Sequence, residues 1–273
     1  MPKAKIEASN LLEDLGFHDV PVIPEDICNA MSSNDYKITF EEQAMSSEEF
    51  HGMSLGSPSG AAILVNSNIQ NRHRKRFTAA HEIGHVHLHV QTNERSEFQC
   101  TAKDISSGSG SNNNFEKEAN EFASSLLMPT SIISPQIQNS DLSWALIEEI
   151  RKLCDVSLEA AARRVMALSK DACCLIIHKD SKMWTPVKSK LFNVFLPSQQ
   201  YPRYLDTDPD NSESSLPSEV DECDFSDWNF PDKSSVGQLF YSSIHNDEFN
   251  RTMTLLLHDE DAEEESDEYN PHF

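Results

Sequence analysis

The spacing of apolar residues along the chain predicts several helices. One apolar stripe, at i, i+4, i+7 and i+11, runs from Phe115 to Leu126, and Pro129 ends the segment. Residues 74–89 also carry apolar side chains at helical spacings, so we expect much of that helix to be buried. Similar patterns predict further helices over residues 3–15, 23–31, 142–154 and 158–168.

Short runs of β-branched and aromatic residues predict strands between these helices. The clearest covers residues 60–66, which either form a plain core strand or lie at a sheet edge where an extended substrate could pair with them. Residues 91–114 include a Ser, Gly and Asn run without apolar anchors, so we expect a flexible loop that is a solvated connector or a lid. Other strands are expected over residues 36–40, 53–55, 173–178, 187–196, 236–244 and 252–257.

The helix over residues 74–89 contains the motif His-Glu-x-x-His. On an α-helix His81 and His85 lie one turn apart on the same face, so both imidazoles can bind one zinc ion. Glu82 lies about 100° around the helix from His81, where it can reach a zinc-bound water rather than the metal. A surface helix can carry this motif by chance, but burying these side chains without a partner is costly. The motif therefore predicts a zinc hydrolase.

A catalytic zinc site needs a third protein ligand and one open position. In the helix that follows, Glu116 and Glu118 flank the apolar stripe at similar angles, so periodicity leaves two candidates. A third histidine of the motif His-Glu-x-x-His-x-x-Gly-x-x-His is excluded, because Leu88 and Gln91 occupy the required positions. We expect His87 and His89 to be structural or exposed to solvent, with His89 closer to the site.

Three segments together resemble the ImmA/IrrE family of zinc metallopeptidases: residues 62–66 (AILVN), 76–85 (RFTAAHEIGH) and 118–129 (EANEFASSLLMP). The resemblance implies a zincin-like core in which the glutamate directly before the Ala-Asn pair, Glu118, is the third zinc ligand. It also implies limited cleavage of a helix-turn-helix transcriptional repressor that controls stress-response or mobile-element genes. Glu116 remains the alternative ligand.

The expected activity is that of a zinc-dependent endopeptidase with Zn2+ as its cofactor. His81, His85 and Glu118 would hold the metal, and Glu82 would act as general base and pass its proton to the leaving amine. The sequence favours no single donor for the oxyanion among its candidates, His51, Tyr201, Tyr204 and Tyr241. Asn120 or a backbone carbonyl would orient a ligand histidine.

Acidic residues are concentrated near the end of the chain. Of the net charge of −23, residues 206–273 contribute −18, with 20 Asp and Glu against Lys233 and Arg251. Such a segment repels phosphate backbones, so direct nucleic-acid binding is disfavoured, whereas a basic protein partner would be attracted. The alternative is a solvated, loosely folded tail. Helices 142–154 and 158–168 resemble a helix-turn-helix, but their few basic residues favour packing over DNA reading.

No apolar run approaches the roughly 18 residues of a membrane helix. Residues 1–7 lack the apolar core of a signal peptide, so we expect none. The six cysteines lack paired spacing, which favours free thiols in a reducing cytoplasm.

The predicted fold class is α+β, in three regions. Residues 1–130 form the metallopeptidase core, residues 131–170 form a helical unit packed on it, and residues 171–273 form an acidic α+β region. Within the last region, 205–235 is predicted to be a loop and 259–273 an acidic tail. Two alternatives to a peptidase remain open: a non-catalytic protein that binds a repressor, and a component of a toxin–antitoxin-like pair.

Overall fold

The computed structural model describes residues 2–45, 47, 49–106, 114–179, 182–183, 186–194, 217–223, 225, 237–246 and 251–260. The fold is α+β, with two small sheets and helices, as predicted. The chain divides into two units, residues 1–139 with 145–161, and residues 140–144 with 162–273. This division groups the residues differently from the three predicted regions, which remain a prediction.

The first unit contains a four-stranded sheet in the order β1-β3-β2-β4. Its strands are β1 (Lys37–Gln43), β2 (Phe50–Ser57), β3 (Gly60–Asn66) and β4 (Glu97–Thr101). Only the β1–β3 pair is parallel. Residues 60–66 were expected to form either a core strand or an edge strand that pairs with substrate. Because β3 is paired on both sides, it is a core strand and offers no free edge. The edge strands are β1 and β4.

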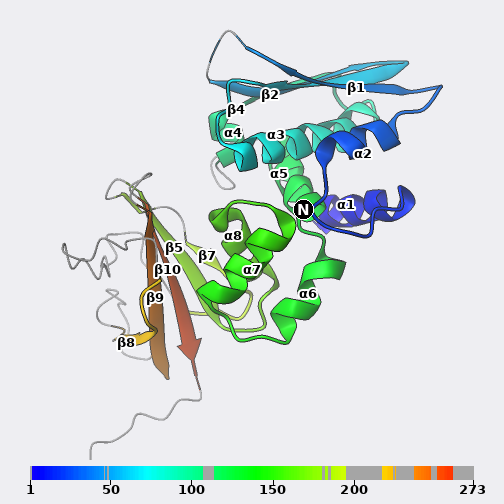
Figure 1. The fold of residues 1–273 in the computed structure, drawn as a ribbon. Helices are drawn as coiled ribbons and strands as arrows, with labels where there is room; N and C mark the ends of the chain where they lie inside the picture. Colours follow the sequence, from blue (N-terminus) through cyan, green and yellow to red (C-terminus); the bar gives the residue numbers. More distant parts are fainter. Residues whose placement is uncertain are drawn as a thin grey trace, which may run out of the picture. The chain divides into compact units, whose positions relative to one another are not determined.

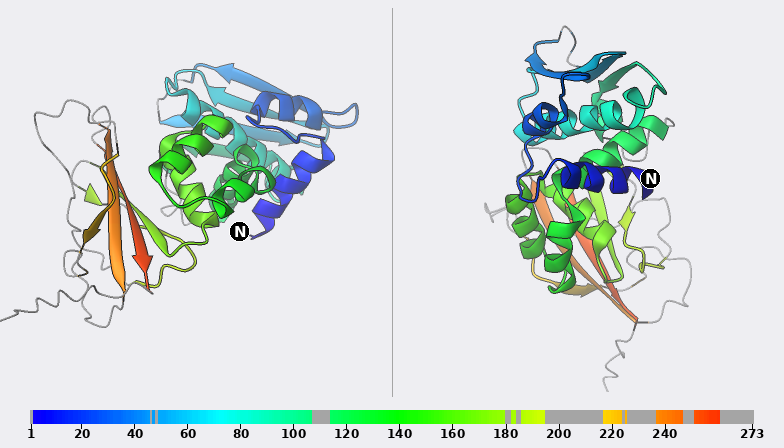
Figure 2. Two further views of the ribbon diagram at one scale, coloured as in Figure 1. Left: turned by 60° about the horizontal axis from the view of Figure 1, so that its bottom comes forward. Right: turned by 90° about the vertical axis from the view of Figure 1, so that its right-hand side faces the viewer.

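Helix α3 (Arg72–His85) lies along one face of this sheet, and α5 (Asn114–Leu127) lies on the far side of α3 (Figures 1 and 2). A π-helical turn, η1 (Val86–Val90), continues α3. The other helices are α1 (Pro2–Asp14), α2 (Pro24–Met31), α4 (Ala102–Ser106), α6 (Thr130–Gln138), α7 (Trp144–Cys154) and α8 (Leu158–Leu168).

The two ligand-bearing helices approach closely because α3 carries a glycine at the contact. A Cβ at Gly84 would lie 3.1 Å from Cδ1 of Phe122 and 3.2 Å from Cα of Ala119, which is tighter than ordinary packing. Ala119 and Phe122 belong to the apolar stripe of α5 and are fully buried. Burial of this stripe therefore holds the backbone of α5 against the helix that carries the His-Glu-x-x-His motif.

The first half of α3 is anchored by Asp155, in the turn between α7 and α8. The Oδ2 atom of Asp155 lies 2.8 Å from Nη1 of Arg76, and its Oδ1 atom lies 2.5 Å from Nη2 of Arg72. Arg76 also donates to the carbonyl oxygen of Val22 at 2.6 Å. Charge-assisted hydrogen bonds of this kind are the stronger class, and here they join three segments that are distant in sequence.

We expect Asp155→Asn to lower the free energy of unfolding by about 1–3 kcal/mol, because it leaves the largely buried Arg76 and the exposed Arg72 without their anion. Asparagine tolerates the positive φ of 53° at this position, so backbone strain does not add to the loss. The matched control is Glu42→Gln, which removes a more exposed pair with Lys75 and should cost less than about 1 kcal/mol. Urea denaturation of both variants measures the difference, and equal losses would contradict this role of Asp155.

The residues between the two ligand helices are more regular than the sequence indicated. Residues 91–114 were expected to be a loop, but they contain β4 and α4. In β4 the side chains alternate between exposed and buried, and Phe98 and Cys100 face inward. Only two residues of this short strand are buried, so its apolar pattern is weak. The polar run at residues 106–114 then made the whole segment resemble a loop. The part of the expected loop at 107–113 lies outside the described residues.

The second unit contains a sheet in the order β6-β5-β10-β9-β8, with β7 paired to β5. Its strands are β5 (Cys173–Lys179), β6 (Lys182–Met183), β7 (Val187–Lys188), β8 (Asp221–Cys223), β9 (Gln238–Asn246) and β10 (Arg251–Asp259). Strands β9 and β10 confirm the strands predicted over residues 236–244 and 252–257, and they pair antiparallel as a hairpin. Strand β8 lies within residues 205–235, which were predicted to be loop; most of that segment and residues 261–273 lie outside the described part of the chain.

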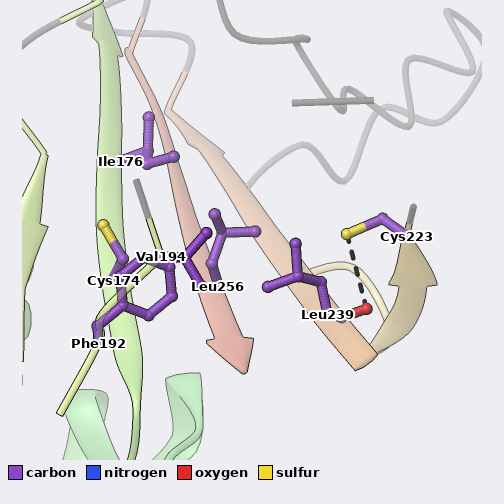
Figure 3. Packing of buried hydrophobic residues seen from close by; sticks show 7 residues of the cluster. All are labelled: Cys174, Ile176, Phe192, Val194, Cys223, Leu239 and Leu256. Carbon is purple, nitrogen blue, oxygen red and sulfur yellow. Dashed lines mark hydrogen bonds between the residues drawn. The ribbon is translucent and has the colours of Figure 1, made fainter. Parts of the chain in front are cut away.

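Apolar side chains from several of these strands form one buried cluster (Figure 3). Ile176 of β5, Leu239 of β9 and Leu256 of β10 are fully buried in it. The Cys223 thiol lies 3.7 Å from the carbonyl oxygen of Leu239, which joins β8 to the edge of the sheet. Within the described ranges, every helix is too short or too polar to cross a lipid bilayer.

Candidate metal centre

Four buried side chains from α3, α5 and β4 converge on one point. The Nε2 atoms of His81 and His85 are 3.0 Å apart, and Oε2 of Glu116 lies 3.1 Å from the first and 3.3 Å from the second. Sγ of Cys100 lies 3.2 Å from Nε2 of His81. One ligand atom from each of the four residues lies within 4.8 Å of all the others.

The structure separates the two candidate glutamates. Glu116 is buried and meets both imidazoles, whereas Glu118 is partly exposed and its Oε2 atom lies 3.1 Å from Nε2 of His89. Glu118 was expected at the imidazoles, and this placement differs from that expectation. The reason is helical phase: Glu116 precedes Ala119 by three positions and shares its buried face, while Glu118 is rotated by about 200° from Glu116.

Asn120 fixes the tautomer of His81. Its amide nitrogen donates to the carbonyl oxygen of Asp104 at 2.7 Å, so its Oδ1 atom faces Nδ1 of His81 at 3.0 Å. Because Oδ1 can only accept, Nδ1 of His81 must carry the proton. In a neutral His81, Nε2 therefore directs its lone pair toward the cluster, as a metal ligand requires. Asn120 was one of the orienting groups that the sequence suggested.

A second hydrogen-bonded chain reaches His85 through η1. The carboxylate of Glu118 accepts from Nε2 of His89, and Nδ1 of His89 lies 3.2 Å from Nδ1 of His85. A neutral His89 that donates from Nε2 must accept at Nδ1, so His85 is the donor in this pair. Nε2 of His85 is then left with a lone pair that also points into the cluster. Glu118 thus orients His85 through His89, and Phe98 stacks on His85 at a centroid distance of 4.0 Å.

The donor atoms fit a cation. Two imidazole lone pairs and a carboxylate oxygen face one another at 3.0–3.3 Å, and such an arrangement needs a shared proton or a metal ion between its members. Burial acts to lower the pKa of His81, but the hydrogen bond with Glu116 and the charges of Glu82 and Glu116 together outweigh it, and the pKa is raised. Burial lowers the pKa of His85 to about 3. A set of two nitrogens, one oxygen and one sulfur is typical of zinc.

Glu82 lies beside this cluster and is fully buried. Its Oε2 atom accepts a 2.5 Å hydrogen bond from Ser54 of β2. Among the described residues, no hydrogen-bond partner reaches its Oε1 atom, and a Cβ at Gly52 would collide with that oxygen. Burial raises the pKa of Glu82 to about 7, although His81 and Ser54 act in the opposite direction. Glu82 is therefore fixed through one oxygen and can exchange a proton at neutral pH through the other.

Asn120→Ala should weaken zinc binding by about 10–100-fold, because His81 loses the partner that holds its tautomer. The measurement is competition with a chromophoric chelator of known affinity. Ser124→Ala, one helical turn further along α5, is the matched control and should stay within about twofold. Equal affinities of the two variants would show that Asn120 does not orient the ligand.

Sequence reasoning missed Cys100 and Ser54. The signal for Cys100 was the alternation in residues 97–101, in which two apolar residues stand among three polar ones. Ser54 lies in the expected strand over residues 53–55, but nothing local distinguishes a serine that contacts a distant glutamate. Of the oxyanion candidates, His51 is buried in β2 and Tyr241 lies in β9 of the second unit, whereas Tyr201 and Tyr204 lie outside the described residues.

Comparisons with known proteins agree with this geometry. Residues 34–166 match the family model of a peptidase domain described as the IrrE N-terminal-like domain. The matched range includes all the side chains of the metal cluster. The chain is also 32% identical over 99 residues to a protein of Bacillus phage phi105 named uncharacterized immunity region protein 2. That alignment covers 36% of this chain and 55% of the phage protein, so the chain spans little more than half of this relative.

Proposed function

We propose that the protein is a zinc-dependent endopeptidase that makes limited cuts in a protein substrate, since residues 34–166 match the IrrE N-terminal-like family of peptidase domains. The observation that carries this proposal is the convergence of His81, His85 and Glu116 beside the buried carboxylate of Glu82. A structural zinc site has no need of such a carboxylate, whereas peptide hydrolysis requires a general base.

In this proposal His81 and His85 hold zinc through their Nε2 atoms, and Glu116, in place of Glu118, supplies the carboxylate oxygen. When bound, zinc would act as a Lewis acid that polarises the scissile carbonyl and makes an attacking water more acidic. Glu82 takes the proton of that water at Oε1 and delivers it to the leaving amine, while Ser54 holds Oε2 in place. Asn120 and His89 keep the two ligand imidazoles in the required tautomers.

Strand β4 is a suitable place for the substrate backbone. It is an edge strand of the first sheet, and its residues Phe98 and Cys100 reach His85 and His81 respectively. An extended peptide could add to such an edge through main-chain hydrogen bonds, which tolerate many side chains. This assignment replaces β3, whose two neighbours already occupy its hydrogen-bonding groups.

We propose a basic helix-turn-helix transcriptional repressor as the substrate, so that cleavage would switch on stress-response or mobile-element genes. The phage relative is named as an immunity region protein. This name supports the proposal that the substrate is a repressor. The excess of acidic residues after position 205 would attract a basic protein. All six cysteines are buried free thiols, which supports a reducing cytoplasm as its location.

The test is to incubate the purified full-length chain with candidate helix-turn-helix repressors and zinc, with and without a chelator, and to look for discrete fragments by mass spectrometry. We expect one or two fragments that the chelator abolishes and added zinc restores. Chelator-resistant cleavage would contradict the proposal, as would tight repressor binding without any cleavage. The latter result would favour the non-catalytic alternative, a regulator that sequesters a repressor.

A further inference from the structure

We infer that Cys100 is a fourth zinc ligand that closes the metal site in its resting state, so that zinc accepts water or substrate only after the thiolate is released. This inference rests on the proposed zinc centre and extends it. A catalytic zinc site keeps one coordination position open, whereas a structural site is filled by four protein ligands. In this chain the fourth donor is already present, on the edge strand next to which the substrate is proposed to bind.

The distances between the ligand atoms are within about 0.4 Å of the edges of a zinc tetrahedron. With metal–ligand bonds of about 2.0–2.1 Å to nitrogen or oxygen and 2.3 Å to sulfur, tetrahedral geometry separates the ligand atoms by roughly 3.3–3.6 Å. The separations in the cluster are 3.0 Å between the imidazole nitrogens, 3.2 Å from sulfur to His81 and 3.7 Å from sulfur to Glu116. The sulfur of Cys100 therefore lies where the fourth ligand atom of a tetrahedral site is expected.

The surroundings of Cys100 suit a ligand better than a free nucleophile. The side chain is fully buried, and its sulfur lies 3.7 Å from the carboxylate of Glu116. Without a cation, a thiolate here would face the carboxylates of Glu82 and Glu116, so it would be neither stable nor reactive. A divalent ion reverses this balance, because it deprotonates a coordinating thiol outright. The proton leaves to solvent, and the sulfur lone pair forms the bond to the metal.

Release of the thiolate requires only a movement of β4. Cys100 lies in a five-residue edge strand that, among the described residues, pairs only with β2. The register of the β2–β4 pair shifts between Phe50 and Gly52, and Gly52 is the partner of Cys100. A peptide that adds to the free edge of β4 would pull on the strand that carries the sulfur. Substrate binding and opening of the metal site would then be coupled, which would protect other proteins from an exposed zinc hydrolase.

X-ray absorption of the zinc-loaded wild-type chain tests the coordination without any variant. We expect one sulfur at about 2.3 Å in the first shell together with nitrogen and oxygen ligands. A first shell without sulfur would overturn the inference. In the cobalt-substituted protein the same ligand should give a near-ultraviolet thiolate charge-transfer band that Cys100→Ser abolishes. Cys28→Ser, which alters an equally buried thiol of α2, should leave this band unchanged.

Closure of the site is tested with acetohydroxamate, a small metal-binding probe that needs an open coordination position. If the thiolate occupies the site nine-tenths of the time, the probe should bind cobalt-loaded Cys100→Ser about tenfold more tightly than the wild type. Equal probe affinities of Cys100→Ser and the wild type would overturn the closure. Neither measurement uses a repressor, so absence of repressor cleavage would count against the proposed function and leave this inference standing.

Discussion

Glu116→Gln is expected to bind zinc at least about 100-fold more weakly than the wild type, whereas Glu118→Gln should lose no more than about tenfold. Glu116 contributes the only carboxylate oxygen among the four convergent ligand atoms, and its replacement leaves a neutral amide facing two imidazoles. Glu118 acts one step further away, because it orients His89, which in turn orients His85. Metal content after dialysis and chelator competition measure both effects.

The control for this pair is Glu121→Gln on the same helix. Glu121 forms an ion pair with Lys5 and points away from the cluster, so its substitution changes the charge of α5 by the same amount without touching a ligand. Zinc affinity should then stay within about twofold of the wild type. Should Glu118→Gln lose zinc while Glu116→Gln retains it, the assignment of the third ligand would have to be reversed.

Glu82→Gln should retain zinc and lose cleavage by about 100- to 10,000-fold, the usual contribution of a general base. The amide fills the same space between Ser54 and Gly52, but it cannot take a proton from water at the position of Oε1. Rates with a repressor fragment at saturating zinc, together with metal content, separate loss of chemistry from loss of metal. The conservative change also avoids leaving a cavity in the buried site.

The matched control is Glu97→Gln, an exposed carboxylate on β4 that lies near the proposed substrate edge. This variant should cleave at nearly the wild-type rate. A Glu82→Gln protein with normal zinc content and undiminished cleavage would exclude Glu82 as the base. A protein that lost its zinc would instead assign Glu82 a role in holding the metal.

The third ligand illustrates where reasoning from the sequence reached its limit. The apolar stripe of α5 predicted the helix and identified its buried face, but two glutamates flank that stripe. Resemblance to a family favoured Glu118. The packing of Ala119 and Phe122 against Gly84 rotates α5 so that Glu116 meets the imidazoles instead. The two glutamates lie about 200° apart around the helix, so its rotation about its own axis decides which of them reaches the metal, and only packing sets that rotation.

The sequence by itself determined the features that depend on local spacing. One helical turn between His81 and His85 places two imidazoles on one face, and Glu82 follows at a fixed angle, because an α-helix has a constant rise and pitch. The sequence also determined the amphipathic helix of α5 and the β9–β10 hairpin. Only the tertiary structure decided that Glu116 meets the histidines, that Cys100 lies beside them and that β4 is an edge strand. These features join residues that are distant in sequence, such as His81 and Glu116, which are 35 positions apart, and depend on how helices and strands pack.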